Sequence, residues 1–264
     1  MQIYKLLEKV RSQKPVVHHL TNWVTIYDCA QVVKSFGASP VMAHAKEEVE
    51  DMVKIASSLV LNIGTLTVDF VEAMKLAARS ANAKGIPIVL DVCGAGATRL
   101  RDKKCFEIID HAAIDIIKGN SSEIARIAGE DVRTKGVDAG EVKEDLIIVA
   151  KKLARKYNCA VVITGKEDIV AGIDKVCIVK NGHQMMTHVV GTGCMAASVI
   201  GTFAAVERDY VYAASAGLSC FGIAGELAAK KSKGPMAFKQ NLLDSIYALD
   251  ENTVKKMQRV TLHF

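Results

Sequence analysis

The segment IPIVLDV, residues 86–92, indicates the architecture of this chain. It is rich in β-branched residues, is apolar up to Asp91, and follows a helical pattern over residues 67–84 that ends at Gly85. A strand that is apolar on both faces needs cover on both faces, which is typical of parallel sheets flanked by helices. The segment therefore predicts a buried strand with a carboxylate at its end.

Similar segments recur as far as residue 165. The further predicted strands are PVVHHL (15–20), SPVMA (39–43), SLVLNIG (58–64), IDIIKG (114–119) and CAVVITG (159–165). Helical patterns follow them over residues 24–36, 46–56, 121–129 and 141–157. Buried strands that alternate with helices predict an α/β fold with a mostly parallel central sheet and helices on both faces.

The pattern changes after residue 165. The stretch EDIVAGIDKVCIVKNGHQMMTHV, residues 167–189, resembles consecutive short strands with a turn at Asn181-Gly182. It predicts an antiparallel extension at one edge of the sheet. Beyond residue 191 the pattern is nearly all helical. Because no linker or repeat divides the sequence, we expect one domain over residues 1–264.

The composition excludes some classes of function. The 264 residues are half apolar, and the net charge of +5 is spread without a basic block, which argues against binding of nucleic acid. Seven cysteines are scattered without a Cys-x-x-Cys pair, which predicts reduced thiols and a cytoplasmic protein. Residues 185–206 and 210–225 lack charged residues, but their polar content or short length predicts buried helices and no membrane span.

Polar residues and glycines gather where the predicted strands end. These residues are His18, His19, Thr21, Asn22, Met42, His44, Asn62, Gly64, Thr65, Asp91, Lys118, Gly119, Asn120, Thr164 and Gly165. Turns favour such residues in any case. Ligands of open parallel sheets, however, bind beyond the carboxyl ends of the strands. The collection as a whole therefore predicts a small-molecule site at this edge.

The stretch HVVGTGCMAAS, residues 188–198, places a thiol where glycines open a helix. Glycines allow backbone N–H groups to converge, and the positive end of the helix dipole adds to them, so the stretch predicts an anion site. The same field lowers the pKa of a thiol, which makes Cys194 a candidate functional residue. The alternative is a buried thiol that fills a gap in the core. Gly94 and Gly96 would similarly let the backbone approach a phosphate.

Three other chemistries fit the sequence poorly. A cysteine phosphatase needs an arginine six residues after its cysteine, where this chain has Ile200. The stretch TGKED lacks the spacing and the hydroxyl of a P-loop. The stretch GTGCMA matches a dinucleotide-binding pattern but lies late in the chain. A dinucleotide-dependent oxidoreductase is therefore a weak alternative.

Two carboxylates are candidates for a magnesium site. Asp91 ends a buried strand, where a carboxylate is costly unless it is paired, hydrated or bound to metal. Glu123, in KGNSSE (118–123), could order Mg²⁺ through water, because Mg²⁺ keeps several waters and needs few carboxylates. Asn120 and Glu123 also fit a helix capping box, which needs no ligand. The ammonium group of Lys118 could bind a phosphate. Alternatively, Lys118 could be a solvent-exposed lysine at the end of a strand.

Taken in order, these motifs resemble the hydroxyethylthiazole kinase family of the ribokinase-like superfamily. The matching segments are HHLTNWVTIYDCAQVVKSFGASPVMA (18–43), LVLNIGTL (59–66), DVCGAGAT (91–98), KGNSSEI (118–124), VITG (162–165) and VVGTGCMAAS (189–198). The resemblance implies a ribokinase-like fold and a transferase activity. ATP would phosphorylate the primary alcohol of 4-methyl-5-(2-hydroxyethyl)thiazole, giving the thiazole phosphate and ADP in a salvage step of thiamine biosynthesis.

The resemblance also implies roles for single residues and an assembly. Asn22, Met42 and Gly191 would contact the thiazole substrate. Lys118 and Thr164 would contact ATP, and Asp91 and Glu123 would serve Mg²⁺. Cys194 would be the catalytic residue, accepting a hydrogen bond or a proton from the attacking hydroxyl. The expected assembly is a homotrimer with sites built between subunits.

The chain departs from the family at two positions. It reads Asp91-Val92-Cys93-Gly94 where Asp-Pro-Val-Gly is common, and Lys118 stands where an arginine is common. A lysine binds phosphate as a point charge and cannot form the bidentate fork of arginine. The open alternatives are a ribokinase-like kinase of another small alcohol, against which the cysteine in GTGC argues, and a nucleotide-binding regulatory protein without catalysis.

Overall fold

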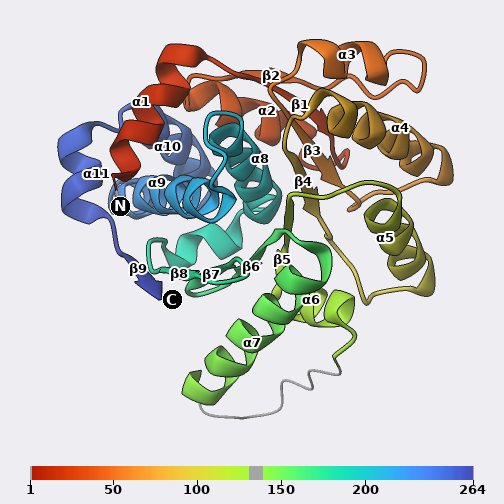
Figure 1. The fold of residues 1–264 in the computed structure, drawn as a ribbon. Coiled ribbons are helices and arrows are strands. Elements are labelled where there is room, and N and C mark those ends of the chain that lie inside the picture. The colour runs from red at the N-terminus through yellow and green to blue at the C-terminus, as the bar shows by residue number, and fades with distance from the viewer. Residues whose placement is uncertain (1, 131–138, 264) are drawn as a thin grey trace.

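The computed structural model describes residues 2–130 and 139–263, which form a layered α/β fold (Figure 1). Within these ranges nine strands form one sheet in the order β2-β1-β3-β4-β5-β6-β7-β8-β9. The strands are β1 (Val16–Leu20), β2 (Ser39–Val41), β3 (Ser58–Asn62), β4 (Ile88–Asp91), β5 (Ile116–Asn120), β6 (Ala160–Thr164), β7 (Asp168–Ala171), β8 (Val176–Val179) and β9 (Val260–His263). The pairs from β2 to β6 are parallel, and the pairs from β6 to β9 are antiparallel.

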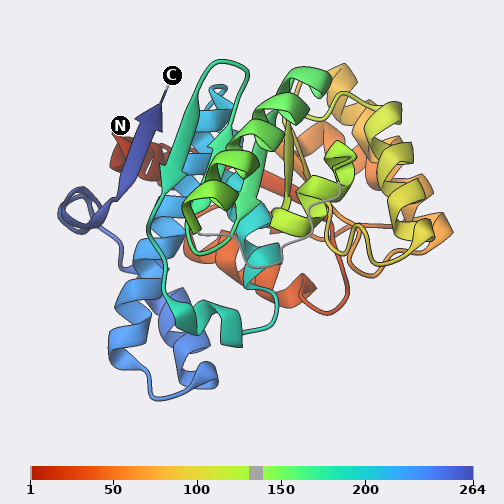
Figure 2. The ribbon, with the colours of Figure 1, turned by 90° about the horizontal axis from the view of Figure 1, so that it is seen from below.

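Helices cover both faces of the sheet (Figures 1 and 2). One face carries α1 (Ile3–Gln13), α2 (Ile26–Ser35), the 3-10 helix η1 (Gln184–His188), α8 (Thr192–Ala204), α9 (Tyr210–Lys231), α10 (Pro235–Tyr247) and α11 (Glu251–Met257). The other face carries α3 (Val49–Ile55), α4 (Val68–Lys84), α5 (Arg99–His111), α6 (Ser121–Ala128) and α7 (Ala139–Tyr157). Each face has its own apolar core, because successive residues of a strand point to opposite faces.

The fold class predicted from the sequence is confirmed. All six predicted parallel strands form, each within the predicted segment or within one residue of it, and the five predicted helices lie between them. The α4 helix shows why its start and its end could be predicted from the local sequence. Thr67 caps its first turn by accepting a hydrogen bond from the Phe70 backbone N–H at 3.1 Å, and Gly85 ends it with a φ of +74°.

The predicted turn at Asn181-Gly182 is wrong. The hairpin between β7 and β8 turns earlier, where the Gly172 N–H donates to the Lys175 carbonyl at 2.8 Å. Asn181 instead lies buried after β8, and its amide group donates to Glu226 at 3.0 Å and to the Met257 carbonyl at 2.9 Å. These long-range hydrogen bonds satisfy the side chain, so it connects the sheet to α9 and α11.

Two short elements also differ from the expectation. Residues 184–188 form the 3-10 helix η1 in place of a strand, and β9 adds a strand near the C-terminus of a region predicted to be helical. β9 pairs with β8 in a register that sets Val260 opposite Val179. Its residues Val260–His263 alternate apolar and polar, but the strand is only four residues long and residues 261–263 are exposed, so it has no buried face.

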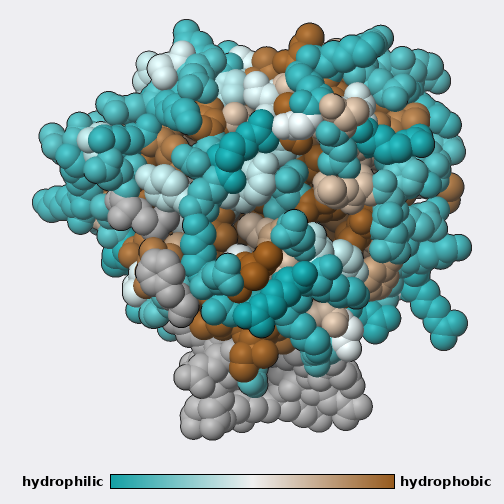
Figure 3. Space-filling view, viewed as in Figure 1, coloured by the Kyte–Doolittle hydropathy of each residue, from teal (hydrophilic) through white to brown (hydrophobic). Residues whose placement is uncertain are grey.

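Residues 210–225 lie almost wholly inside the molecule, as predicted, whereas the stretch 185–206 is largely buried only from Met195 onward and has exposed residues before α8. Among the described residues α9 is long and apolar enough to cross a membrane by length and composition, yet 83% of its apolar window is buried in the fold. The α8 helix lies close against the sheet, since a Cβ atom at Gly201 would come within 2.4 Å of Val60 Cγ2. The face shown in Figure 3 is mainly hydrophilic, with hydrophobic patches between.

Two adjacent histidines are buried in β1. His19 is 1% exposed, and its Nδ1 lies 3.0 Å from the Val17 carbonyl, which can only accept a hydrogen bond. Its Nε2 has no hydrogen-bond partner in the described part of the chain. Burial lowers the pKa of His19 from 6.5 to about 4 and also lowers the pKa of His18. The folded state therefore holds His19 neutral.

We expect the free energy of unfolding to fall as the pH is lowered from 6.5 towards 4. In that window the unfolded chain binds a proton at residue 19 and the folded chain does not, so acid favours unfolding. Replacement His19→Gln should reduce the fall by up to about 3 kcal/mol, the equivalent of the lost pKa difference. Urea unfolding at several pH values measures this. The control is His111→Gln at an exposed position, which should show the same fall in the free energy of unfolding as the wild type. An equal fall in both variants would contradict the attribution of the acid sensitivity to His19.

Candidate active site

Three adjacent parallel strands end in polar residues that lie side by side at the same edge of the sheet. The register sets Asn62 of β3 beside Asp91 of β4, and Asp91 beside Lys118 of β5. Asn62 donates to Asp91 Oδ2 at 2.8 Å, and Asn22, after β1, donates to Asn62 Oδ1 at 3.0 Å. The Lys118 ammonium completes the row at 3.2 Å from Asp91 Oδ1. The predicted site residues Asn22, Asp91 and Lys118 thus lie in one connected network.

Asp91 and Lys118 form a buried ion pair. Asp91 is 0% and Lys118 is 4% exposed. Burial raises the pKa of Asp91, and the Lys118 ammonium opposes that effect. Burial alone would lower the pKa of Lys118, but the carboxylates of Asp91 and Glu123 outweigh it and raise the pKa. The sequence left open whether Asp91 is paired, hydrated or metal-bound, and the structure shows that it is paired.

The N-terminus of α8 lies against this ion pair. Gly191 is the N-cap residue with a φ of +93°, and a Cβ atom there would come within 2.4 Å of Thr25 Cγ2, so only glycine fits. A Cβ atom at Gly193 would lie 3.4 Å from Lys118 Nζ. The free N–H groups of the first helical turn and the lysine ammonium therefore converge, a combination that favours an anion.

Cys194 stands in the first turn of α8 with several polar neighbours. Asn22 Nδ2 donates to its sulfur at 3.2 Å. The hydrogen bond from Cys93 is the largest of the effects that lower the pKa of Cys194 to about 5; Thr25, Lys118 and Asn22 add to it, and burial opposes it. These neighbours therefore favour the thiolate form of the sulfur. Cys194 does not simply fill a gap in the core.

Glu123 joins two parts of the site through its carboxylate. It forms the predicted capping box, since its Oε2 accepts from the Asn120 N–H at 2.7 Å and Asn120 Oδ1 accepts from the Glu123 N–H at 2.9 Å. Its Oε1 accepts from the Gly94 N–H at 2.7 Å. The Gly96 N–H donates to Asp102 at 2.7 Å. Both N–H groups donate to carboxylates in this structure, and the expectation that the backbone at Gly94 and Gly96 approaches a phosphate stays a prediction.

The remaining predicted residues flank this centre. Thr164 ends β6 opposite Asn120 and donates to the Gly119 carbonyl at 3.3 Å. Met42 follows β2, the edge strand beside β1, and its carbonyl lies 3.3 Å from His44 Nδ1. Asn22, Asp91, Lys118, Cys194 and Gly191 are thus brought together, while Thr164 and Met42 stand on opposite sides of them.

Several residues of the site were given no individual role from the sequence, although Asn62 was among the strand-end residues that predicted a small-molecule site. Asn62 links Asn22 to Asp91, and Thr25 donates to Asn22 Oδ1 at 3.0 Å. The Arg101 guanidinium donates to the carbonyls of Ile63 at 2.9 Å and Gly64 at 2.8 Å, so it fixes the loop after β3. The position of Asn62 at a strand end was a usable signal. The contacts of Thr25 and Arg101 depend on tertiary structure.

An aromatic cluster lies beside Asn22. The ring of Trp23 is 4.6 Å from the His44 ring in an edge-on contact and 5.9 Å from the Phe70 ring in a stacked one. Trp23 is still 48% exposed. The cluster therefore offers a partly open apolar wall on the same side of the site as Asn22, of the kind that accepts a flat ring.

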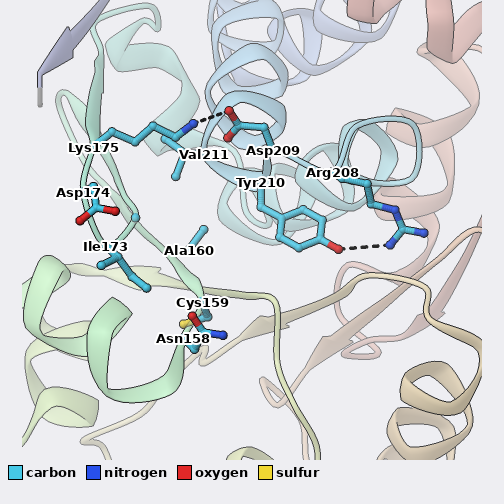
Figure 4. A pocket seen from close by; sticks show the side chains of 11 residues that line it. Asn158, Cys159, Ala160, Ile173, Asp174, Lys175, Arg208, Asp209, Tyr210 and Val211 are labelled. Carbon is cyan, nitrogen blue, oxygen red and sulfur yellow. Dashed lines mark hydrogen bonds and ion pairs between the residues drawn. The ribbon is translucent and has the colours of Figure 1, made fainter.

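Two cavities lie in the described part of the chain at different ends of the sheet. One of about 570 Å³ is bounded by the loop after β4 and by α6, and includes Glu123. Another of about 430 Å³ lies at the amino end of β6 (Figure 4). There Lys175 pairs with Asp209, and Arg208 donates to the Tyr210 hydroxyl at 3.2 Å. It contains none of the predicted site residues, and its charged groups are largely paired with one another.

The described residues contain no cluster of three or more His, Cys, Asp or Glu side chains arranged to hold a metal ion. Mg²⁺ does not require such a cluster, because it is usually held by one or two carboxylates together with phosphate oxygens and waters. Asp91 and Glu123 both lie near Lys118 and provide the hard oxygen donors that Mg²⁺ prefers. Their chemistry therefore fits a magnesium ion that arrives with a nucleotide.

The fold is similar to that of a protein described as ribokinase-like. A ribokinase-like superfamily protein from Enterococcus faecalis superimposes with a TM-score of 0.66 at 13% identity, covering 93% of this chain and 94% of the other. A hydroxyethylthiazole kinase from Methanosarcina acetivorans is 54% identical over 252 residues, 96% of this chain and 97% of the relative. The structure of a hydroxyethylthiazole kinase protein from Pyrococcus horikoshii has a TM-score of 0.92 and 37% identity, with 99% of both chains covered.

The model of the hydroxyethylthiazole kinase family matches residues 7–252. This chain belongs to the hydroxyethylthiazole kinase family. The resemblance seen in its motifs is thereby confirmed, and the chain is a kinase.

Proposed function

We propose that this chain transfers the γ-phosphoryl group of ATP to the primary alcohol of 4-methyl-5-(2-hydroxyethyl)thiazole, a salvage step in thiamine biosynthesis. The observation that carries the proposal is the convergence of the α8 N-terminus, Lys118 and Cys194 at the carboxyl ends of the strands. Phosphoryl transfer depends mainly on positioning and on stabilisation of charge, which these groups supply. We take residues 1–264 as one kinase domain.

The phosphate groups of ATP bind at the α8 N-terminus in this proposal. The N–H groups at the start of α8 hold the γ-phosphoryl oxygens, and the Lys118 ammonium balances the charge that develops on them. Thr164, on the far side of Lys118 from Asn22, contacts ATP. Asp91 and Glu123 would hold Mg²⁺, which when bound neutralises phosphate charge and orients the nucleotide.

The alcohol binds on the other side of Cys194. Asn22 and the Met42 backbone contact the thiazole, Gly191 borders it, and the Trp23 cluster packs against its ring. Cys194 then accepts a hydrogen bond from the hydroxyl. A thiol with a pKa of about 5 is a weak base towards an alcohol, so its role is to orient the hydroxyl rather than to remove the proton.

The proposed assembly is a cytoplasmic homotrimer with sites between subunits. Exposed apolar side chains near the site support a partner there: Val24 is 67%, Tyr27 is 69% and Val190 is 73% exposed. Val24 follows Trp23, Tyr27 lies in the first turn of α2, and Val190 precedes Gly191. Contiguous exposed apolar side chains commonly mark a protein interface.

Release of ADP from Mg²⁺-ATP should depend on addition of the hydroxyethylthiazole. The matched control is 4-methyl-5-ethylthiazole, which has the same ring and no acceptor hydroxyl, and it should give no release above background. A coupled ADP assay on the purified protein measures both. Folded protein that binds ATP but shows no thiazole-dependent release would refute the assigned acceptor.

Replacement Cys194→Ala should lower kcat by less than about 100-fold, because loss of an essential general base typically costs about 10²–10⁴-fold. The KM for ATP should change little, since the backbone N–H groups of α8 remain. Replacement Cys194→Asp should give a higher kcat than Cys194→Ala, as a carboxylate can orient the same hydroxyl. Complete loss of turnover in a folded Cys194→Ala variant would show that the thiol does more than orient.

A charge at the apolar surface near the site should disrupt the trimer. We expect Tyr27→Asp to reduce the molar mass measured by light scattering, and to lower thiazole turnover while ATP binding persists. The control is Ile148→Asp on α7, a side chain that is equally apolar and 64% exposed. An unchanged mass for Tyr27→Asp, or an equal loss for Ile148→Asp, would contradict this interface.

A further inference from the structure

Asn62 is a buried side chain to which the proposed mechanism gives no role. It ends β3 and is 1% exposed. Its Oδ1 accepts from Asn22 Nδ2 at 3.0 Å and from the Gly64 backbone N–H at 2.9 Å. Its Nδ2 donates to Asp91 Oδ2 at 2.8 Å. Asn62 therefore stands between Asn22, on the alcohol side of the proposed site, and the buried ion pair.

The neighbours of Asn62 fix the orientation of its amide group. The Gly64 backbone N–H can only donate a hydrogen bond, and the Asp91 carboxylate, paired with Lys118, can only accept one. An exchange of the amide oxygen and nitrogen would set two donors against each other at Gly64 and two acceptors at Asp91. Buried polar groups without partners are costly, so the Asn62 oxygen faces Asn22.

The orientation of the Asn22 amide is fixed in the same way. Its Oδ1 accepts from the Thr25 backbone N–H at 3.1 Å and from the Thr25 hydroxyl at 3.0 Å. Its Nδ2 group has two N–H bonds to place, and their acceptors are Asn62 Oδ1 at 3.0 Å and Cys194 Sγ at 3.2 Å. Because both N–H bonds lie in the plane of the amide, the hydrogen bond to Asn62 directs the other one towards the sulfur.

We infer that Asn62 is a positioning residue for phosphoryl transfer, which holds the Asn22 amide in the orientation that aims Nδ2 at the Cys194 sulfur. The inference rests on the proposed function, in which that sulfur orients the hydroxyl of the alcohol. Asn62 acts through Asn22, and the Asp91 carboxylate serves as its anchor. A displacement of about 1 Å at a reacting group can lower the rate about 100-fold, so a residue that acts on Cys194 through one intermediary is able to affect kcat.

A purely structural role for Asn62 would have different consequences. The same hydrogen bonds join the loop after β3 to β4, so loss of the amide group lowers stability in either case. A residue that acts only on stability leaves the turnover of the folded enzyme unchanged. A positioning residue lowers kcat, and its effect disappears once Asn22 is replaced, because the group that it orients is then absent.

The test is a double-mutant cycle on thiazole-dependent ADP release, with kcat measured at saturating thiazole and Mg²⁺-ATP. Asn62→Leu and Asn22→Ala should each lower kcat about tenfold, since each disturbs the contact between Asn22 and the sulfur. The double variant should fall within about twofold of Asn22→Ala, because effects that pass through one shared contact do not multiply. Effects that multiply, or an unchanged kcat in folded Asn62→Leu, would overturn the inference.

The matched control is Asn181→Leu, because Asn181 is another buried amide and lies outside the site. It is 5% exposed and donates to Glu226 at 3.0 Å and to the Met257 carbonyl at 2.9 Å. The variant should lose thermal stability, as Asn62→Leu does, while its kcat stays at the wild-type value. An equal loss of kcat in both variants would show that general loosening of the fold accounts for the effect, and would refute the positioning role.

A crystal structure of Asn62→Leu gives a readout that does not depend on turnover. The Asn22 side chain should turn so that Nδ2 no longer lies within hydrogen-bond distance of Cys194 Sγ, and an unchanged contact would contradict the inference. Asn62→Ala replaces the leucine variant in every measurement if the leucine variant does not fold. Wild-type protein without thiazole-dependent release would refute the assigned acceptor, while the structure would still decide the role of Asn62, so the two failures are distinguishable.

Discussion

The Asp91–Lys118 ion pair is the interaction on which the arrangement of the site depends. Both groups are buried at the carboxyl ends of adjacent parallel strands, and removal of one partner from such a pair typically costs about 3–5 kcal/mol. A well-packed apolar pair could stabilise the fold as well, so stability alone does not explain these charges. Their value lies in placing an ammonium group and a carboxylate, at fixed positions, next to the first turn of α8.

The path of α8 brings its N-terminus to that ion pair. At Gly201 the helix passes so close to Val60 of β3 that no side chain fits between them, and at Gly191 the chain enters the helix against Thr25 with a positive φ. Glycine is required at both positions for different reasons, close packing in one and backbone conformation in the other. Together they place Cys194 within reach of Asn22, although 172 residues separate the two in sequence.

The fold was largely predictable, since buried strands and capped helices carry strong local signals. The strand predicted within IPIVLDV ends at Asp91, as expected, and Asp91 lies beside Lys118 of β5. The Asn181-Gly182 signal failed because buried partners from α9 and α11 satisfy Asn181 better than a turn would. In the site, strand-end residues such as Asn22 and Lys118 were predictable from topology. Thr25 and Arg101 were not, because their contacts come from tertiary packing.

In the proposed function, the charges of the site disfavour a nucleotide that enters without a cation. Lys118 faces three groups that carry negative charge when ionised: the carboxyl groups of Asp91 and Glu123 and the Cys194 sulfur. A triphosphate adds several more negative charges next to the same ammonium, and like charges in a poorly solvated site repel strongly. The helix N-terminus offsets only about half an elementary charge. The proposed binding of ATP at α8 would therefore need a cation that enters with it, and the two carboxylates, which hinder a bare nucleotide, are the groups that would attract that cation.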